Sequence, residues 1–415
     1  MIHLLLIVEL VLVAGLIPWF ALLGAVLLAA VGRRLVDGGG AGMATEPTAQ
    51  FLIVIPAHDE AEVIAVTVAS CLRVDYAPGR YQVCVIADNC TDATAAVAEA
   101  AGAHVVVRVD PARRSKGYAL ADFFDDVAND PLIRPFDAYV LVDADTSVAP
   151  DLLRAFDQSL RRGDDFVQGY YGVRNADASW RTRMMTYAFS LANGVWLVGT
   201  DALGLSVGLK GNGMCFRADA LARFPWRVHG LVEDMEFAWA LRVGGERVRF
   251  QPRARVYGEM VSRGGAGAAS QRRRWESGRQ ALRASVRPRL WESPHLSVGQ
   301  KVAGQVELNF PPLSRLVLGL LVASALATWG AWQSSGQEIW LVIGAILITA
   351  WGLLLAYALS PLLIMGLPVR FLLSLIHLPY YMAWKLTLGR RRRPDLWIRT
   401  PRESGPTPSD ISLKK

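Results

Sequence analysis

The chain has 415 residues, which is enough for one large domain or two medium ones. Hydrophobic residues make up 52% of it and gather at the two ends, which excludes a wholly soluble globular protein. The net charge is +7, but arginines beside the apolar segments account for much of the excess, so no nucleic-acid partner is needed to explain it. The four cysteines show neither metal-ligand spacing nor a CxxC pair, which is typical of small buried residues in a reducing compartment.

The N-terminal block MIHLLLIVELVLVAGLIPWFALLGAVLLAAV is longer than the roughly 20 apolar residues that cross a bilayer. It lacks the basic start of a signal peptide and is too long for one. Arg33 and Arg34 follow it, and positive residues stay on the cytosolic side. We therefore expect an uncleaved transmembrane anchor over 1–34 with its N-terminus outside, followed by a small, polar linker over 35–50.

Apolar runs alternate with helical stretches between residues 51 and 145. Four runs are expected to be strands: 51–57, 81–88, 104–110 and 138–145. Helices are expected over 60–72, from near Thr91 and from about Lys116. The runs are apolar on both faces, like strands of a buried parallel sheet, so the pattern predicts a doubly wound, mostly parallel α/β sheet. No GxGxxG motif follows a strand, which disfavours a dinucleotide cofactor.

Acidic residues follow three of the predicted strands, where ligands of such sheets bind. Glu60 follows the first strand, Asp88 ends the second, and Asp143 and Asp145 end the fourth. Carboxylates there suit a divalent cation, a ribose hydroxyl or a base edge, and Asp143 and Asp145 could hold Mg²⁺ or Mn²⁺ together. The alternatives are a solvated loop or helix cap for that pair, and an Asx turn or N-cap for Asp88.

Two further segments carry candidate site residues at predicted helix starts. Lys116 lies in RRSKGYAL, where a lysine suits a phosphate contact, although an ordinary surface lysine is the alternative. Glu233 and Asp234 open the stretch EDMEFAWALRVGG, where the helix macrodipole alone would also favour acids. The upstream segment KGNG, 210–213, is expected to be a tight loop lining a pocket.

The run QRRRW places Gln271, Arg274 and Trp275 on one face if it is helical, because they are spaced i, i+3, i+4. Arginine is a forked donor suited to pyrophosphate oxygens, and an indole ring can stack on a sugar. A solvated charged helix is the alternative, but such a face would rarely hold a tryptophan. The run therefore favours a clamp for a phosphorylated substrate.

The C-terminal third contains two expected spans, 316–332 and 339–364. A further segment, 371–388, is amphipathic and is followed by the arginines 390–393. If the central region is cytosolic, a third span here would leave those arginines outside, so an interfacial helix is preferred. The expected membrane region is thus 296–388, and 389–415 is a basic cytosolic tail with a disordered end.

The ordered motifs PAHDE, IADNCTD, KG, DAD, VED and QRRRW resemble the membrane-bound family 2 glycosyltransferases. This branch includes cellulose, chitin, hyaluronan and poly-N-acetylglucosamine synthases and ceramide glucosyltransferase. The resemblance covers residues 50–290 and the placement of the membrane segments. It implies a GT-A-like cytosolic domain over 51–295, at the inner (plasma) membrane. It also implies an inverting hexosyltransferase that needs Mg²⁺ or Mn²⁺ and forms a β bond from a UDP-sugar to a polysaccharide or oligosaccharide acceptor.

The same resemblance implies a role for each motif residue. It assigns nucleoside binding to Glu60 and Asp88, a uracil or phosphate contact to Lys116, and nucleotide and metal binding to Asp143 and Asp145. Asp234, beside Glu233, is the implied general base. Closure over the pyrophosphate and the acceptor is assigned to Gln271, Arg274 and Trp275. Asp145 is the more direct metal ligand of the two. Val232 stands where many members have threonine, a change expected to affect packing more than chemistry.

Other readings remain open from the sequence. Single-transfer relatives that glycosylate a membrane lipid carry the same Gln, Arg and Trp pattern, so the motifs do not separate them from polymer synthases. A non-catalytic membrane scaffold is disfavoured by the intact acids and Arg274. A nucleic-acid binder is disfavoured because no aromatic residues are interleaved with the arginines. A partner membrane subunit is compatible with this organisation.

Overall fold

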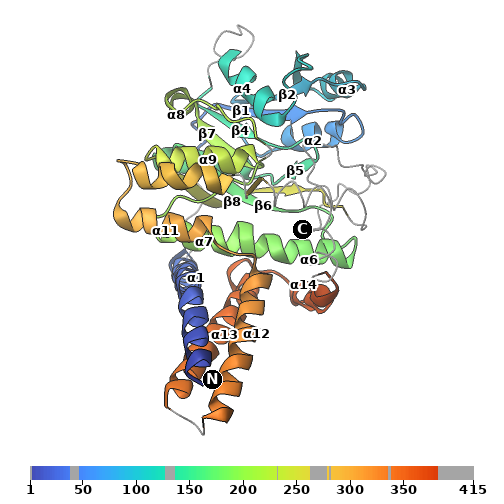
Figure 1. Cartoon of the computed structure of the whole chain (residues 1–415). Helices are drawn as coiled ribbons and strands as arrows, with labels where there is room; N and C mark the ends of the chain where they lie inside the picture. The colour runs from blue at the N-terminus through green and yellow to red at the C-terminus, as the bar shows by residue number, and fades with distance from the viewer. Residues whose placement is uncertain are drawn as a thin grey trace.

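The computed structural model describes residues 2–37, 46–126, 136–230, 232–261, 278–279, 282–334 and 338–381. It consists of an α/β domain that sits on a bundle of long helices (Figure 1). Three helices of the described part are long and apolar enough to cross a membrane: α1 (Ile2–Asp37), α12 (Leu313–Gln333) and α13 (Glu338–Ile364). They correspond to the anchor and to the two spans that the sequence predicts.

The domain is built on one sheet with the strand order β3-β2-β1-β4-β7-β6-β8-β5. The first four strands are parallel and are the predicted ones: β3 (His104–Arg108), β2 (Tyr81–Asp88), β1 (Phe51–Ala57) and β4 (Ala138–Leu141). The other four are β7 (Met214–Arg217), β6 (Phe166–Val173), β8 (Val248–Gly258) and β5 (Thr146–Val148). β7 is antiparallel to β4 and β6, and β5 is antiparallel to β8, whereas β6 and β8 are parallel. The predicted α/β class is confirmed, with a mixed second half of the sheet.

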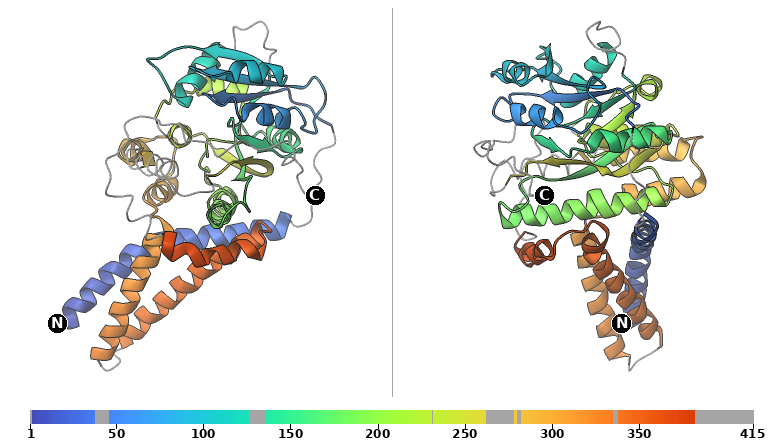
Figure 2. Two further views of the ribbon diagram at one scale, coloured as in Figure 1. Left: turned by 90° about the vertical axis from the view of Figure 1, so that its right-hand side faces the viewer. Right: turned by 180° about the vertical axis from the view of Figure 1, so that it is seen from behind.

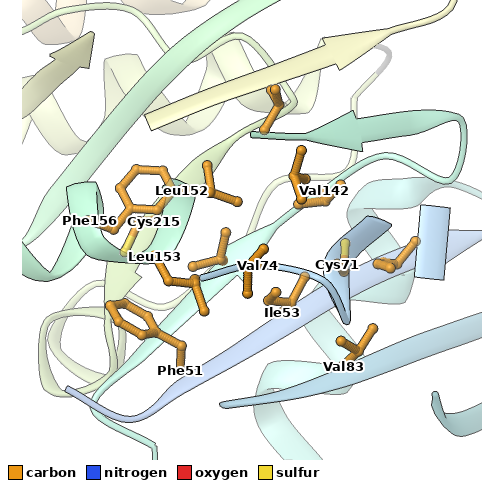
Figure 3. Close-up of a cluster of buried hydrophobic side chains, with 14 of the residues drawn as sticks. Phe51, Ile53, Cys71, Val74, Val83, Val142, Leu152, Leu153, Phe156 and Cys215 are labelled. Atoms are coloured by element: carbon orange, nitrogen blue, oxygen red, sulfur yellow. The ribbon is translucent and has the colours of Figure 1, made fainter. Parts of the chain in front are cut away.

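Helices cover both faces of the sheet, as expected for a doubly wound domain. One face carries α2 (Ile64–Cys71), α3 (Thr94–Ala100) and α5 (Leu152–Arg161), and the other carries α4 (Lys116–Asp126), α8 (Ala218–Arg223) and α9 (Glu233–Val243). β1 shows why both faces must be covered. Phe51, Ile53 and Ile55 point into the first core, part of which Figure 3 shows, and Leu52 and Val54 point into the second. Successive strand residues point to opposite faces of the sheet, so a strand that is apolar throughout is buried on both faces.

Several predicted boundaries shift in the structure, and the shifts have local causes. β4 ends at Leu141, so Asp143 and Asp145 lie in the turn that leads to β5. The predicted helix near Thr91 begins at Thr94, where Asp92 Oδ1 accepts a hydrogen bond of 2.9 Å from the Thr94 backbone N–H. The Asx turn considered for Asp88 is thus made by Asp92, and the N-cap residue of the helix is Ala93.

A continuous helical rod lies between the sheet and the bundle in both views (Figures 1 and 2). It consists of α6 (Trp180–Phe189), the π-helical turn η2 (Ser190–Val195) and α7 (Trp196–Ala202). Side chains tie the turn to the sheet: Tyr170 Oη and Ser190 Oγ are 3.2 Å apart, and Asn193 Nδ2 donates to the Tyr171 carbonyl at 3.0 Å. Beyond the domain, α11 (Val298–Leu308) leads into α12.

The chain continues after α13 as α14 (Val369–Leu373) and the 3₁₀ turn η3 (Ser374–His377), beside the rod. This part overlaps the predicted interfacial helix 371–388, of which 382–388 lies outside the described residues. Three of the four cysteines are buried and all four are free, in line with the prediction.

Candidate active site

Lys116 connects segments that are far apart in the sequence, at the carboxyl end of the parallel strands. Its Nζ donates to Asp143 Oδ1 and to the Gly211 carbonyl oxygen, both at 2.5 Å. Burial lowers the pKa of Lys116, but the charges of Asp143 and Glu233 outweigh this and leave it raised. A protonated lysine therefore stands among carboxylates at the start of α4, where backbone N–H groups also favour an anion.

Gly117 explains how the loop before α9 comes so close to Lys116. A Cβ atom at Gly117 would lie 2.4 Å from the Val228 carbonyl oxygen and 2.9 Å from His229 Cα. Only a residue without a side chain lets this backbone pass over the start of α4. The ring of the next residue, Tyr118, stacks on the His229 ring with 4.1 Å between the ring centroids. The KG motif thus docks the segment that continues into Glu233.

The loop 210–213 is held by the side chain of Gln168, a buried residue of β6. Gln168 Oε1 accepts from the Lys210 backbone N–H at 2.8 Å, and its Nε2 donates to the Asn212 carbonyl at 2.9 Å. Asn212 in turn accepts from the Asp143 backbone N–H at 3.2 Å and donates to Thr146 Oγ1 at 2.8 Å. The predicted pocket loop is therefore fastened to the turn that carries the DAD motif.

Glu233 and Asp234 begin α9 and face this assembly. A Cβ atom at Gly211 would lie 3.4 Å from Asp234 Oδ2, so the carboxylate lies directly against the loop. Burial raises the pKa of Glu233 to about 7, the charge of Asp234 adds to the effect, and Lys116 opposes it. Burial also raises the pKa of Asp234. A buried carboxyl group whose pKa is raised is suited to accept a proton from a hydroxyl group.

Asp88 ends β2 and Glu60 follows β1, so both lie at the same edge of the sheet, where β1 is the neighbour of β4 and β2 is the next strand beyond it. Asp88 is buried, and its Oδ1 accepts from Arg108 at 2.6 Å. Burial raises the pKa of Asp88, and the Arg108 hydrogen bond opposes that. Glu60 is also buried, and its backbone N–H donates to Thr94 Oγ1 at 2.8 Å. Both acids are thus fixed beside the site.

The chemistry of the donor set at the DAD turn fits a hard divalent cation. Asp143 and Asp145 are both half-buried carboxylates on one turn, the ligand type that Mg²⁺ and Mn²⁺ prefer. Because Lys116 holds one oxygen of Asp143, the arrangement fits a primary role for Asp145. Thr146 Oγ1 lies 3.5 Å from Asp145 Oδ1 and packs the turn against Asn212.

A second acidic group in the described part of the chain consists of Asp59, Cys90 and Asp92, whose ligand atoms lie within 4.8 Å of one another. Asp59 Oδ1 accepts from the Thr91 backbone at 2.6 Å, and Asp92 accepts from Thr94. Burial raises the pKa of the Cys90 thiol, which disfavours the thiolate that a metal would need. Hydrogen bonding within the loop explains this group better than a metal does.

Gln271, Arg274 and Trp275 lie outside the described residues. Gly278 follows them shortly in the chain and is described. A Cβ atom at Gly278 would lie 2.5 Å from Val232 Cγ1, so the chain after the QRRRW motif returns to the residue that precedes Glu233. Val232 is buried in this contact, which gives it a packing role.

Sequence reasoning missed three supporting residues: Arg108, Gln168 and Arg242. Arg108 pairs in register with Asp88 on the neighbouring strand, so the strand alignment could have found it. Gln168 stands alone as a polar residue in an apolar strand, which is a weak signal. Arg242 is buried at the end of α9, where it binds Glu307 of α11 at 2.7 Å and stacks on Trp239. It fixes the helix that carries Asp234.

Comparison with known proteins agrees with this architecture. Residues 47–278 match the sequence model of glycosyltransferase like family 2. The chain is similar in fold to the mannosyltransferase PcManGT from Pyrobaculum calidifontis, determined with GDP-Man and Mn²⁺. That likeness has a TM-score of 0.51 and 18% identity, and covers 85% of this chain and 98% of the other.

Two further structures are more distant. Residues 1–349 of S. aureus TarS give a TM-score of 0.42 at 12% identity, over 63% of this chain and 72% of that one. Glucosyl-3-phosphoglycerate synthase from Mycobacterium tuberculosis gives 0.37 at 17% identity, over 65% and 86%. No curated protein sequence matches the chain. The family match spans more than half of the residues, and the fold is GT-A-like, so the chain belongs to glycosyltransferase like family 2.

Proposed function

We propose that the protein is an inverting hexosyltransferase that uses a UDP-sugar donor and works at the cytosolic face of the inner membrane. The convergence of Lys116, Asp143 and Asp234 around the loop at Gly211 carries this proposal. These residues are dispersed over more than a hundred positions and meet in one place, as a site for an anionic donor and a hydroxyl acceptor requires. The GDP-Man in the Pyrobaculum mannosyltransferase structure supports a nucleotide-sugar donor in this fold.

The chemistry follows from the charges at the site. Asp234 accepts the proton of the acceptor hydroxyl as that oxygen attacks the anomeric carbon. Lys116 stands where the donor phosphates gather negative charge as the bond to the sugar breaks. Asp145 and Asp143 would hold Mg²⁺ or Mn²⁺, which supplies charge neutralisation for the diphosphate leaving group. In this proposal the acceptor oxygen attacks directly and no covalent intermediate is formed, so one displacement turns an α-linked donor into a β product.

Residues around this centre take binding roles in the proposal. Glu60 and Asp88 hold the nucleoside at the edge of β1 and β2. Gln271, Arg274 and Trp275 close over the pyrophosphate, and the return of the chain at Gly278 to Val232 supports this placement. Glu233 is the partner of Asp234 and tunes its titration.

The membrane placement rests on α1, α12 and α13. We place Arg33 and Arg34 on the cytosolic side of the membrane, so the anchor 1–34 has its N-terminus outside the cytosol. The linker 35–50 and the domain 51–295 then lie in the cytosol. The membrane region 296–388 and the basic tail 389–415 complete the division that we propose.

The acceptor is a polysaccharide or oligosaccharide in this proposal, and a membrane lipid is the second candidate. One observation favours the lipid. The three described spans pack on one another through buried apolar side chains such as Leu23, Leu320 and Ile343, and these fill the centre of the bundle. A polymer would need a passage, whereas a lipid acceptor reaches the site from the bilayer.

Transfer assays on membranes that contain the full chain test the function. Labelled UDP-sugars and GDP-sugars are offered with Mg²⁺, with Mn²⁺ or with EDTA, and the products are sized and extracted. We expect transfer from a UDP-sugar that EDTA abolishes. High-mass product identifies a polymer synthase, and organic-extractable product identifies a glycolipid synthase. Nucleotide binding without transfer from any donor would support the scaffold reading instead.

The coupled carboxyl pair predicts the pH dependence of the reaction. Burial raises the pKa of the base Asp234, so it becomes protonated at a higher pH than an ordinary aspartate, and the acidic fall of kcat/KM should begin at a correspondingly higher pH. Glu233→Gln removes one negative charge beside Asp234 and lowers the pKa of the remaining carboxyl, so the acidic limb should move to lower pH. Glu236→Gln, one turn further along α9, serves as the control and should leave the limb in place. An unmoved limb in Glu233→Gln would contradict the coupling.

A further inference from the structure

We propose that the helical segment 369–381 is a membrane-surface anchor that inserts one apolar face among lipid headgroups and holds α6 against the bilayer. This inference rests on the proposed membrane placement but not on catalysis. Its partner is the lipid bilayer, with a preference for anionic headgroups. A second copy of the chain and a transmembrane path are the competing outcomes of the test.

The segment has two unlike faces. Val369, Leu373 and Ile376 are 59%, 68% and 80% exposed. Their spacing, i, i+4 and i+7, places them on one stripe of a helix. Phe371 is only 4% exposed and faces the protein. An exposed stripe of large apolar side chains on one short helix is the pattern of a helix that lies in a membrane interface.

The protein-facing side is fastened to the start of α6. The Trp180 ring lies 4.9 Å from the His377 ring and 5.7 Å from the Tyr380 ring, measured between centroids. Arg370 binds Asp177 at 3.2 Å. Figure 1 shows α14 under the α6 end of the rod. Attachment of this segment to the membrane surface would therefore hold the α6–η2–α7 rod, on which the sheet rests, at that surface.

The position of the segment along the chain keeps it close to the end of a membrane span. It begins five residues after the end of α13 at Ile364, so Val369 lies at most about 18 Å from the end of a membrane span. The charges suit a lipid surface as well. Arg183 and Arg370 both bind the single carboxylate of Asp177, which leaves a net positive charge beside the stripe. Juxtamembrane cations attract anionic lipids.

Site-directed fluorescence on the full chain tests the proposal. An Ile376→Cys variant, in a Cys90→Ser background, is labelled with an environment-sensitive dye and reconstituted into vesicles of phosphatidylcholine and phosphatidylglycerol. Spin-labelled lipids with the quencher near the headgroup or deep in the acyl chain then report depth. We expect a blue-shifted signal that the shallow quencher reduces more than the deep one. Leu373→Cys should behave alike, and provides a second site if the first variant folds poorly.

Val107→Cys is the matched control, because Val107 is an exposed apolar residue on β3, at the opposite edge of the sheet from β5. Its label should escape both quenchers. Stronger quenching of residue 376 by the deep probe would show a transmembrane path, and cross-linking between copies at 376 without quenching would show a protein partner. Either result, or no quenching, overturns the proposal. The readout needs no turnover, so such a failure leaves the proposed enzymatic function standing.

Discussion

Replacing Asp234 by asparagine is expected to lower kcat by roughly 10²–10⁴-fold, the contribution of a general base, while the nucleotide still binds. The asparagine keeps the shape of the side chain against Gly211 but cannot accept the acceptor's proton. Lys116 and Asp143 remain paired, so the contacts assigned to the donor survive. Titration followed by fluorescence or calorimetry measures the nucleotide affinity. Transfer from a labelled donor measures kcat.

The control is Glu236→Gln, which neutralises another half-buried acid of the same helix without touching the Lys116 assembly. It should retain parent activity. Transfer by Asp234→Asn at the parent's rate would show that another group takes the proton. Loss of nucleotide affinity together with activity would show that Asp234 serves the donor side of the site.

Replacing Gly117 by alanine is the second substitution with a large expected effect. The new Cβ would meet the Val228 carbonyl at 2.4 Å, and a backbone atom cannot swing aside as a flexible side chain can. Overpacking of this kind costs about 1–3 kcal/mol of stability. The loop that must move leads directly to Glu233, so activity should fall further than the loss of stability explains. Thermal unfolding and transfer are measured on the same preparation.

Gly299→Ala provides a closely matched control. Gly299 is the second residue of α11, as Gly117 is of α4, but no heavy atom lies within 4 Å of the position where its Cβ would be. Alanine there should be neutral or slightly stabilising, since it restricts the unfolded chain. If Gly117→Ala were equally silent, the close approach of the Val228 loop would not be what assembles the site.

The parallel half of the fold was accessible from the sequence because its strands are buried on both faces. FLIVIPA and YQVCVIAD are apolar almost throughout, and no solvated element reads that way. The other half of the sheet, with strands β7, β6, β8 and β5 in mixed directions, has weaker strand patterns in the sequence. β8, VRFQPRARVYG, alternates apolar and polar residues, but its internal proline and three arginines weaken the strand signal, and β5 is too short at three residues to show a period. Their pairing depends on neighbours that lie far away in the chain.

The candidate site was also only partly predictable from the sequence. The motif acids and Lys116 could be named from their positions after strands and at helix starts, and the structure brings Lys116, Asp143 and Asp234 together. The residues that hold them there could not be named. Gln168 acts through hydrogen bonds to a loop more than forty positions away, and no local pattern marks such a contact. The placement of Gln271, Arg274 and Trp275 stays a prediction.

The crossing of α1 and α7 changes how the N-terminal helix should be regarded. A Cβ atom at Gly199 would lie 2.0 Å from the Val26 carbonyl oxygen, so the two backbones are in direct contact. The helix α1 is therefore a structural support for a rod that lies about 170 residues further along the chain. A soluble version obtained by deleting that helix would expose the flank of α7 to water, so biochemical work on this enzyme belongs with the intact polypeptide in detergent or lipid.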